Sequence, residues 1–166
     1  SIFSYDTQLK PAASSVLFQK KSNEMAMVWC MLRRPNGDVW CGMQGGGLYI
    51  IEAATNKITR SEVLPAGEKT IRQMAEDKAG NIWVGTHYGD VIQWNASTGV
   101  FTKHHQLSGM VSRIRVDSQN RVWVGTDRDG LYSINSTTGK IIQHYAAEGE
   151  KGRKLLYRGV SDILQY

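Results

Sequence analysis

The sequence has little cysteine and little proline, with 2 and 3 residues among 166. Cys30 and Cys41 have no matching second pair, so the sequence carries no convincing zinc signature. It contains no run of about eighteen apolar residues, which excludes a transmembrane helix within it. No signal peptide is evident either, although a fragment that begins inside a domain would lack one in any case. Glycine, at 17 residues, is abundant, as many tight β-turns require.

The charge balance is basic but modest, with a formal net charge of +5. The cations cluster only at residues 20–21, 33–34 and 151–154. Such clusters can attract an anionic partner, such as an acidic oligosaccharide or a nucleic acid. Short charge runs more often lie on solvated loops, and no nucleic-acid-binding motif accompanies them. We therefore predict solvated loops and no nucleic-acid binding by this segment.

A tryptophan motif occurs three times. It reads NGDVWCG at residues 36–42, AGNIWVGT at 79–86 and QNRVWVGT at 119–126. The three copies align without gaps well beyond the motif, and their lengths vary only between repeats. A period of about forty residues is typical of a repeat architecture. Because a repeated unit is mostly scaffold, function should be sought where the repeats differ.

Each repeat reads as four short strands. Residues 71–76 form an apolar-rich first strand, and residues 82–84 are aromatic and β-branched, as suits a buried second strand. A glycine turn leads to a third strand such as 131–134, and a polar turn leads to an outer strand such as 140–145. Four antiparallel strands in about forty residues are typical of a β-propeller blade. We predict an all-β fold built from such blades.

The phase of the repeat predicts an incomplete ring. Residues 3–7 match the end of a third strand, and residues 160–164 match a first strand. We therefore expect three full blades with partial blades at both ends. The expected boundaries are a partial blade at 1–24, blades at 25–67, 68–107 and 108–157, and the first strand of a further blade at 158–166. Propellers close with about four to eight blades, so closure would need the remaining blades of a longer protein or a second copy.

Two local features allow both a structural and a chemical interpretation. Cys30 and Cys41 fall on the first and second strands of one blade, where a disulfide is conceivable in an oxidising compartment. The other repeats carry valine in place of Cys41, which favours free packing thiols. Asn95 and Asn135 begin glycosylation sequons. Both occupy the same repeat position, where a turn needs Asn or Asp, so we favour the turn role.

No catalytic arrangement is recognisable in the sequence. The adjacent His104 and His105 should point to opposite faces of an outer strand, so they could not easily share a metal ion. No carboxylate pair recurs at one turn, and neither a Gly-x-Ser-x-Gly elbow nor a phosphate-binding loop is present. We predict no catalytic residue, no metal site, no cofactor and no enzymatic activity for this segment. A propeller lyase is the less favoured alternative.

The repeat resembles the two-component regulator propeller repeat. The shared pattern is Asp-x-x-Gly-Asn-Ile-Trp-Val-Gly-Thr, a glycine turn, and Asn-x-x-Thr-Gly, best preserved at residues 77–99 and 117–139. The first copy departs from it, with Arg34 for Asp and Cys-Gly-Met at residues 41–43 for Val-Gly-Thr. In that family the propellers are extracytoplasmic sensors of hybrid two-component histidine kinase/response regulators, and many respond to oligosaccharides from polysaccharide breakdown.

The resemblance implies a periplasmic sensor region of an inner-membrane protein that controls transcription through a histidine kinase outside this segment. The turns that follow Trp-x-Gly differ between repeats and are the expected contacts for an oligosaccharide or other small ligand. Their candidate ligand-binding residues are Gln44, His87, Tyr88, Asp127 and Arg128. Tyr88 could stack on a sugar, and Arg128 could form a bidentate pair with a carboxylate. The alternative is a propeller scaffold for protein–protein interaction or oligomerisation, with variable surface turns.

Overall fold

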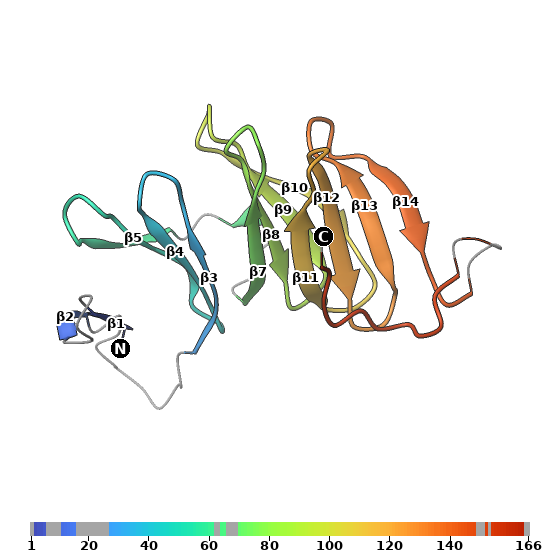
Figure 1. Cartoon of the computed structure of the whole chain (residues 1–166), viewed down its shortest axis with the longest axis horizontal. Helices are drawn as coiled ribbons and strands as arrows, with labels where there is room; N and C mark the ends of the chain where they lie inside the picture. The colour runs from blue at the N-terminus through green and yellow to red at the C-terminus, as the bar shows by residue number, and fades with distance from the viewer. Residues whose placement is uncertain are drawn as a thin grey trace.

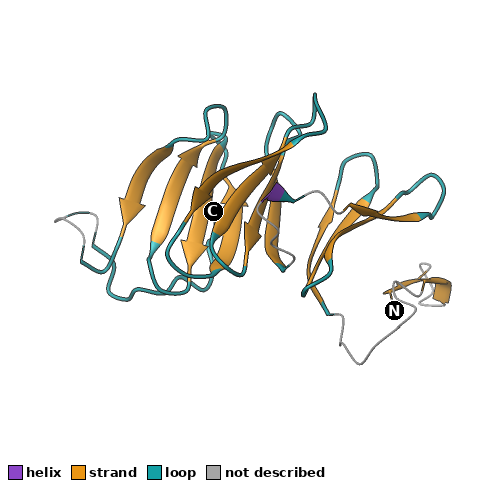
Figure 2. Cartoon of the chain, turned by 180° about the vertical axis from the view of Figure 1, so that it is seen from behind, coloured by secondary structure: helices purple, strands orange, loops and turns teal. Residues whose placement is uncertain are grey.

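The computed structural model describes residues 2–5, 11–15, 27–61, 64–65, 70–148, 152 and 154–164. These residues form β-strands, turns and loops without an α-helix, and Pro65 is the single 3₁₀ position among them (Figure 2). The strands assemble into three four-stranded antiparallel sheets and one two-stranded sheet. The predicted all-β fold is therefore confirmed.

Each four-stranded sheet corresponds to one sequence repeat. The first sheet contains β3 (Val28–Arg33), β4 (Val39–Met43), β5 (Gly47–Ile51) and β6 (Ile58–Ser61). The second contains β7 (Ile71–Glu76), β8 (Ile82–Thr86), β9 (Asp90–Trp94) and β10 (Phe101–Gln106). The third contains β11 (Val111–Val116), β12 (Arg121–Thr126), β13 (Leu131–Asn135) and β14 (Ile141–Tyr145). Within each sheet the strands follow chain order, as in a propeller blade.

The first strands of the three blades lie in a row. β7 contacts both β3 and β11, and the later strands of each blade extend away from this row (Figure 1). A two-stranded sheet of β1 (Ile2–Tyr5) and β2 (Pro11–Ser15) comes before the three blades in the chain. The sheets form an open, unclosed array, which confirms the predicted incomplete ring.

Residues 160–164 lie where the first strand of a further blade would begin. The Val160 amide donates to the Thr126 carbonyl at 2.8 Å, and the Ser112 hydroxyl donates to the Val160 carbonyl. These residues are not assigned to a strand, since no second strand pairs with them in the described part of the chain. The exact blade boundaries stay a prediction, and two of them, at residues 24–25 and 67–68, lie outside the described residues.

Two of the motif tryptophans, Trp40 and Trp83, pack toward the following blade. Trp40 is 3% exposed in a cluster with Ile71 and Met74 of the second blade, and Trp83 is fully buried in a cluster with Val111 and other residues of the third blade. Burial of a tryptophan on this scale contributes about 2–3 kcal/mol or more to the free energy of unfolding. The tryptophans are therefore packing residues that join blade to blade.

The glycine of Trp-x-Gly is required at the same contacts because they leave no room for a side chain. A Cβ atom built on each glycine would lie 2.3–2.9 Å from the side chain that opens the next first strand. The three contacts are Gly42 with Ile71, Gly85 with Val111, and Gly125 with Val160. Side chains cannot approach this closely, so the motif combines a large residue that fills the blade interface with a glycine that lets the next blade come near.

An aspartate closes the first turn in the second and third blades. Asp117 accepts hydrogen bonds from the Gln119 and Arg121 amides, both at 2.9 Å, and from Trp123 Nε1 at 2.8 Å. Asp77 repeats the arrangement and accepts from Trp83 Nε1 at 3.1 Å. The Asp of the repeat thus fixes the turn and orients the motif tryptophan.

In the first blade, an arginine, Arg34, occupies the position of this aspartate. Arg34 donates from Nη2 to Glu76 Oε1 and to the Gly80 carbonyl of the second blade, each at 2.9 Å. Its guanidinium also lies 5.4 Å from the ring centroid of Trp40 and 5.0 Å from that of Trp94. The departure from the repeat pattern therefore links two blades where the other repeats close a turn.

Cys30 and Cys41 are free thiols. Cys30 is paired in register with Gly42, and directly paired residues share a face of the sheet, so the neighbouring Cys41 points to the other face. They accordingly pack in different apolar clusters. Burial raises the pKa of Cys30 to about 12 and of Cys41 to about 11, so both stay protonated at neutral pH. The favoured interpretation of packing thiols agrees with this geometry.

The two sequon asparagines shape turns. The Asn95 side-chain oxygen accepts from the Ser97 and Thr98 amides, and the Asn135 side-chain oxygen accepts from the two amides at the same offsets, all at 2.9–3.0 Å. Asn and Asp favour such turns because their short side chains imitate a backbone turn. The repeated asparagine therefore has a structural role in the chain.

Candidate functional site

The predicted ligand-binding residues lie on turns that lead from the second strand of a blade to the third. Gln44 follows β4, His87 and Tyr88 follow β8, and Asp127 and Arg128 follow β12. The backbone of each turn is anchored in the same way, because its first amide donates to the carbonyl just before the first strand of its blade. These bonds are Gln44 to Met27 at 2.9 Å, His87 to Thr70 at 3.1 Å and Asp127 to Met110 at 3.0 Å. We call residues 44–46, 87–89 and 127–130 the turn face.

The five side chains on the turn face have different freedom to meet a ligand. Gln44, His87, Tyr88 and Arg128 are exposed, with Tyr88 at 69%. The rings of His87 and Tyr88 meet edge to face at 5.2 Å between centroids. Asp127 already accepts from the Met110 amide at 2.8 Å and lies 3.4 Å from Arg128. The structure thus brings together His87 with Tyr88 and Asp127 with Arg128, and their ligand-binding role stays a prediction.

A small hollow opens beside Arg128 on the third blade. It has a volume of about 180 Å³ and is lined by Arg128, Asp129, Glu148, Arg158 and two alanines at 146–147. Arg158 is ion-paired with Glu148, and Arg128 Nη2 lies 3.4 Å from Asp127 Oδ2, so each guanidinium at the hollow has a carboxylate partner. The hollow is large enough for a single small polar group.

The wall behind this hollow is stiffened by a polar cluster. Tyr132 donates to Asp129 at 2.5 Å, and the His144 ring stacks on Tyr132 at 4.0 Å between centroids. His144 Nε2 lies 2.7 Å from the Asp129 carbonyl. Burial and the bond to Asp129 raise the pKa of Tyr132, so its hydroxyl keeps its proton and acts as a donor. These residues support the turn rather than face a ligand.

A second, wider depression runs along the first strands. It has a volume of about 670 Å³ and is lined by residues 31–35, 73–76 and 113–116. We call it the first-strand groove. It lies toward the turns that join first and second strands, at the opposite end of the strands from the turn face. Four arginines, Arg33, Arg34, Arg113 and Arg115, line it beside a single carboxylate, that of Glu76.

Side chains from neighbouring blades meet along these first strands. Arg113 Nε donates to Asp162 Oδ1 at 2.6 Å, and Arg113 Nη1 lies 3.5 Å from Gln73 Oε1, so three successive first-strand positions are linked. Near the start of the strands, the guanidinium of Arg72 lies 3.7 Å from the ring centroid of Trp29. The bond from Arg113 lowers the pKa of Asp162, which keeps that carboxylate charged.

Sequence reasoning missed this surface although its signal was present. One equivalent first-strand position carries a different residue in each blade: Cys30, Gln73 and Arg113 are each paired in register with the glycine of their Trp-x-Gly. Gln73 and Arg113 line the groove. Which side chains share the groove depends on the stacking of first strands, which a single repeat does not disclose.

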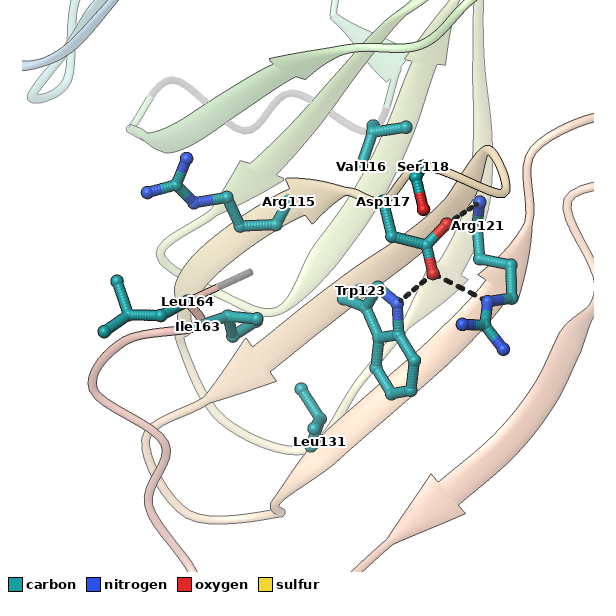
Figure 3. A pocket seen from close by; sticks show the side chains of 9 residues that line it. All are labelled: Arg115, Val116, Asp117, Ser118, Arg121, Trp123, Leu131, Ile163 and Leu164. Carbon is teal, nitrogen blue, oxygen red and sulfur yellow. Dashed lines mark hydrogen bonds and ion pairs between the residues drawn. The ribbon is translucent and has the colours of Figure 1, made fainter. Parts of the chain in front are cut away.

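Another hollow, of about 790 Å³, lies on the flank of the third blade (Figure 3). Trp123, Leu131 and Ile163 line it, together with the Asp117–Arg121 pair at 2.7 Å. Trp123 faces this open hollow. Its counterparts in the other two repeats, Trp40 and Trp83, are instead covered by a following blade. We therefore interpret this hollow as a blade-packing surface rather than a ligand site.

The structure gives the other histidines packing roles. A β-bulge falls between Lys103 and His105 on β10, so strict alternation of the side chains fails there. His104 stacks on Trp83 at 5.2 Å, and His105 Nε2 lies 2.6 Å from the Gly139 carbonyl. Both rings lie against Gly139 of the third blade and therefore on the same side of β10, contrary to the expectation that they point to opposite faces of the strand. Among the described residues no group of His, Cys, Asp and Glu is placed to hold a metal ion.

None of the described residues forms a helix long and apolar enough to cross a membrane. The described residues therefore offer strands, turns and two polar surfaces, the turn face and the first-strand groove. These surfaces can bind and orient a polar molecule, and no nucleophile–base pair or metal group is evident among the described side chains that line them.

The family model of the two-component regulator propeller matches residues 66–88 and 105–128. Over these two segments the chain is similar to two-component regulator propellers. The two matched segments contain Trp83 and Trp123, whose repeats also show the closest agreement with the motif. Members of this family are regulator propellers of the sensor type and are not typically catalytic. The predicted resemblance is thus confirmed.

Solved structures share this propeller fold. The extracellular domain of a hybrid two-component system from B. thetaiotaomicron is 26% identical, with a TM-score of 0.64 over 83% of this chain and 17% of that one. A second such domain from the same organism is 19% identical, with a TM-score of 0.74 over 98% of this chain and 22% of that one. PorZ, a surface component of the type-IX secretion system of Porphyromonas gingivalis, is 23% identical, with a TM-score of 0.73 over 95% of this chain and 25% of that one.

The comparison with curated proteins gives no match. The chain spans about a fifth of the length of the extracellular domains that it resembles. The activity and partners of a whole protein therefore do not follow from these similarities, and the second and third structures show the fold alone.

Proposed function

We propose that the chain is part of an extracytoplasmic sensor propeller of a hybrid two-component regulator, and that it binds a small extracellular ligand of the oligosaccharide class. The main support is the match to the regulator propeller family on a scaffold whose exposed turn side chains differ from blade to blade. Rigid strands that present variable turns are the usual division between scaffold and binding site. Periplasmic placement, a membrane anchor and a downstream histidine kinase belong to the same proposal.

The turn face supplies chemistry that suits a sugar. The exposed ring of Tyr88 offers an apolar plane, and His87 and Gln44 offer hydrogen-bonding groups to hydroxyls. Arg128 offers a charged donor at the rim of a small hollow. Because the turn backbones are hydrogen-bonded to the starts of the first strands, a ligand would meet pre-organised turns.

The proposed sensing role requires a ligand, so binding tests it first. The protein is screened by thermal shift against neutral and acidic oligosaccharides, and positive results are measured by calorimetry. At ligand concentrations near one hundred times Kd, the unfolding free energy should rise by about 2.7 kcal/mol. The absence of any saturable binding across the panel would contradict the proposal.

A scaffold function is the second candidate, and the flank of the third blade favours it. Trp123 and Leu131 line an open hollow there, and Met31 is 64% exposed on the first blade. These apolar groups suit contact with further blades, whether from the same protein or from a second copy. A stable dimer in solution without response to any oligosaccharide would favour the scaffold over the sensor.

A further inference from the structure

The first-strand groove differs from the turn face in its charge. Arg34 and Glu76 are ion-paired at 2.9 Å, and Glu76 is the sole carboxylate among the groove's lining residues. Arg33, Arg113 and Arg115 therefore face the groove without a lining carboxylate. The side chains of Arg33 and Arg115 are exposed and form no hydrogen bond or ion pair with a described residue, and Arg115 also lines the hollow on the flank of the third blade.

One of these arginines, Arg113, is paired with the carboxylate of Asp162. This carboxylate lies outside the groove lining, yet it accepts from Arg113 Nε at 2.6 Å. The bond from Arg113 lowers the pKa of Asp162, and Arg115 adds to the effect from a greater distance. Both partners are partly exposed, so the pair can exchange with a carboxylate or sulfate from solution at little cost.

The groove also has the dimensions and the mixed character of a sugar site. Its volume of about 670 Å³ falls in the range of ligand pockets, about 300–1,000 Å³. Apolar side chains of Met31, Met74 and Ile114 form part of its lining between the arginines. Planar guanidinium groups bind carboxylate and sulfate in bidentate geometry.

We propose that the first-strand groove is a subsite for an acidic sugar, with Arg33, Arg113 and Arg115 binding its carboxylate or sulfate groups. This rests on the proposed sensing function and specifies the class of ligand. The subsite is separate from the turn face. The groove therefore binds the charged groups of an acidic oligosaccharide, and the turn face can bind its neutral sugar rings.

The test uses calorimetry on the intact protein with trigalacturonate as acidic probe and maltotriose as neutral probe. Trigalacturonate should bind, and Arg33→Gln with Arg115→Gln should weaken it about tenfold or more, because two charge-assisted bonds are lost. Lys57→Gln with Lys140→Gln removes the same charge from exposed turns elsewhere and should leave Kd unchanged. Asp162→Asn should tighten binding about threefold, because it removes the carboxylate that competes for Arg113.

If both double variants weakened trigalacturonate binding equally, the loss would come from net charge alone and the proposed subsite would be wrong. Binding of maltotriose with the same affinity would refute it as well, while the sensing proposal would stand. If neither probe nor any other sugar binds, both proposals fail together. Unfolding curves of every variant are recorded, and if the double variant is unfolded, the single Arg115→Gln variant must show at least a threefold loss for the subsite to hold.

Discussion

Asp117 organises its repeat through one carboxylate. Burial alone would raise its pKa, but hydrogen bonds from Trp123, Arg121 and Gln119 outweigh this and lower the pKa to about 2. Its counterpart Asp77 holds Trp83 in the same way. At the residue scale, one aspartate therefore both closes the turn and orients the motif tryptophan.

Replacement of Asp117 by Asn should destabilise the protein by about 1–2 kcal/mol, because charge-assisted hydrogen bonds become neutral ones. The lowered pKa means that Asp117 stabilises the fold above the unfolded value near pH 4, and that this contribution is lost as the pH falls toward 2. Denaturant unfolding at pH 6 and at pH 3 measures both effects. Equal stability of variant and parent at pH 6 would contradict this role.

Gly85 lies so close to Val111 of the next blade that a side chain there should destabilise the fold. Gly85→Ala should cost about 1–3 kcal/mol, because a Cβ there would lie 2.3 Å from Val111 Cγ1. Val111→Ala removes the opposing atoms, so the double variant should be less destabilised than the sum of the two single variants. A double-mutant cycle by thermal unfolding measures this coupling, and strict additivity would contradict the contact.

At the scale of the strand, β10 shows how a local irregularity changes side-chain roles. Its bulge at His104 brings His104 against Trp83 and His105 against the turn of the third blade. Gln93, which lies 3.1 Å from His104, also donates to the Ser136 carbonyl. The imidazoles of His104 and His105 thereby fasten the outer strand of one blade to the next blade.

This contact should make stability pH-dependent. Burial, and to a lesser extent the neighbouring His105, lower the pKa of His104 below its usual 6.5. The unfolded chain therefore takes up a proton first, so stability should fall as the pH drops below about 6.5 and level off below the folded pKa. Unfolding midpoints at pH 7.5 and 5.5 test this, with His104→Gln as the control that should show a smaller fall. An equal fall in that variant would assign the effect elsewhere.

The sequence predicted the strands well and their irregularities poorly. Residues 71–76 were expected as a strand and form β7 with the same bounds, because period, turn residues and β-branched side chains all agree there. The first strand of the third blade begins at Val111, and the bulge between Val111 and Arg113 interrupts the alternation of its side chains. Bulges depend on how two strands pair, and a single strand does not reveal them.

At the scale of the whole molecule, the blades stack by one repeated contact. A tryptophan faces the next blade, and a glycine admits the residue that opens its first strand. This stacking also creates the first-strand groove from residues about forty positions apart. The turn face could be foreseen from the repeats. The differing first-strand residues are also visible in the sequence, but which of them share a groove depends on how the blades stack.

The central claim is that side chains which do not repeat, held on a repeating scaffold, bind an extracellular sugar. A calorimetric titration with the best oligosaccharide of the panel, on the parent and on His87→Ala/Arg128→Ala, tests it most directly. Lys57→Ala/Lys140→Ala serves as the surface control. The account predicts saturable binding that the turn-face variant weakens about tenfold or more at an unchanged unfolding temperature, while the control binds normally. No binding by the parent, or equal binding by all three proteins, would contradict it.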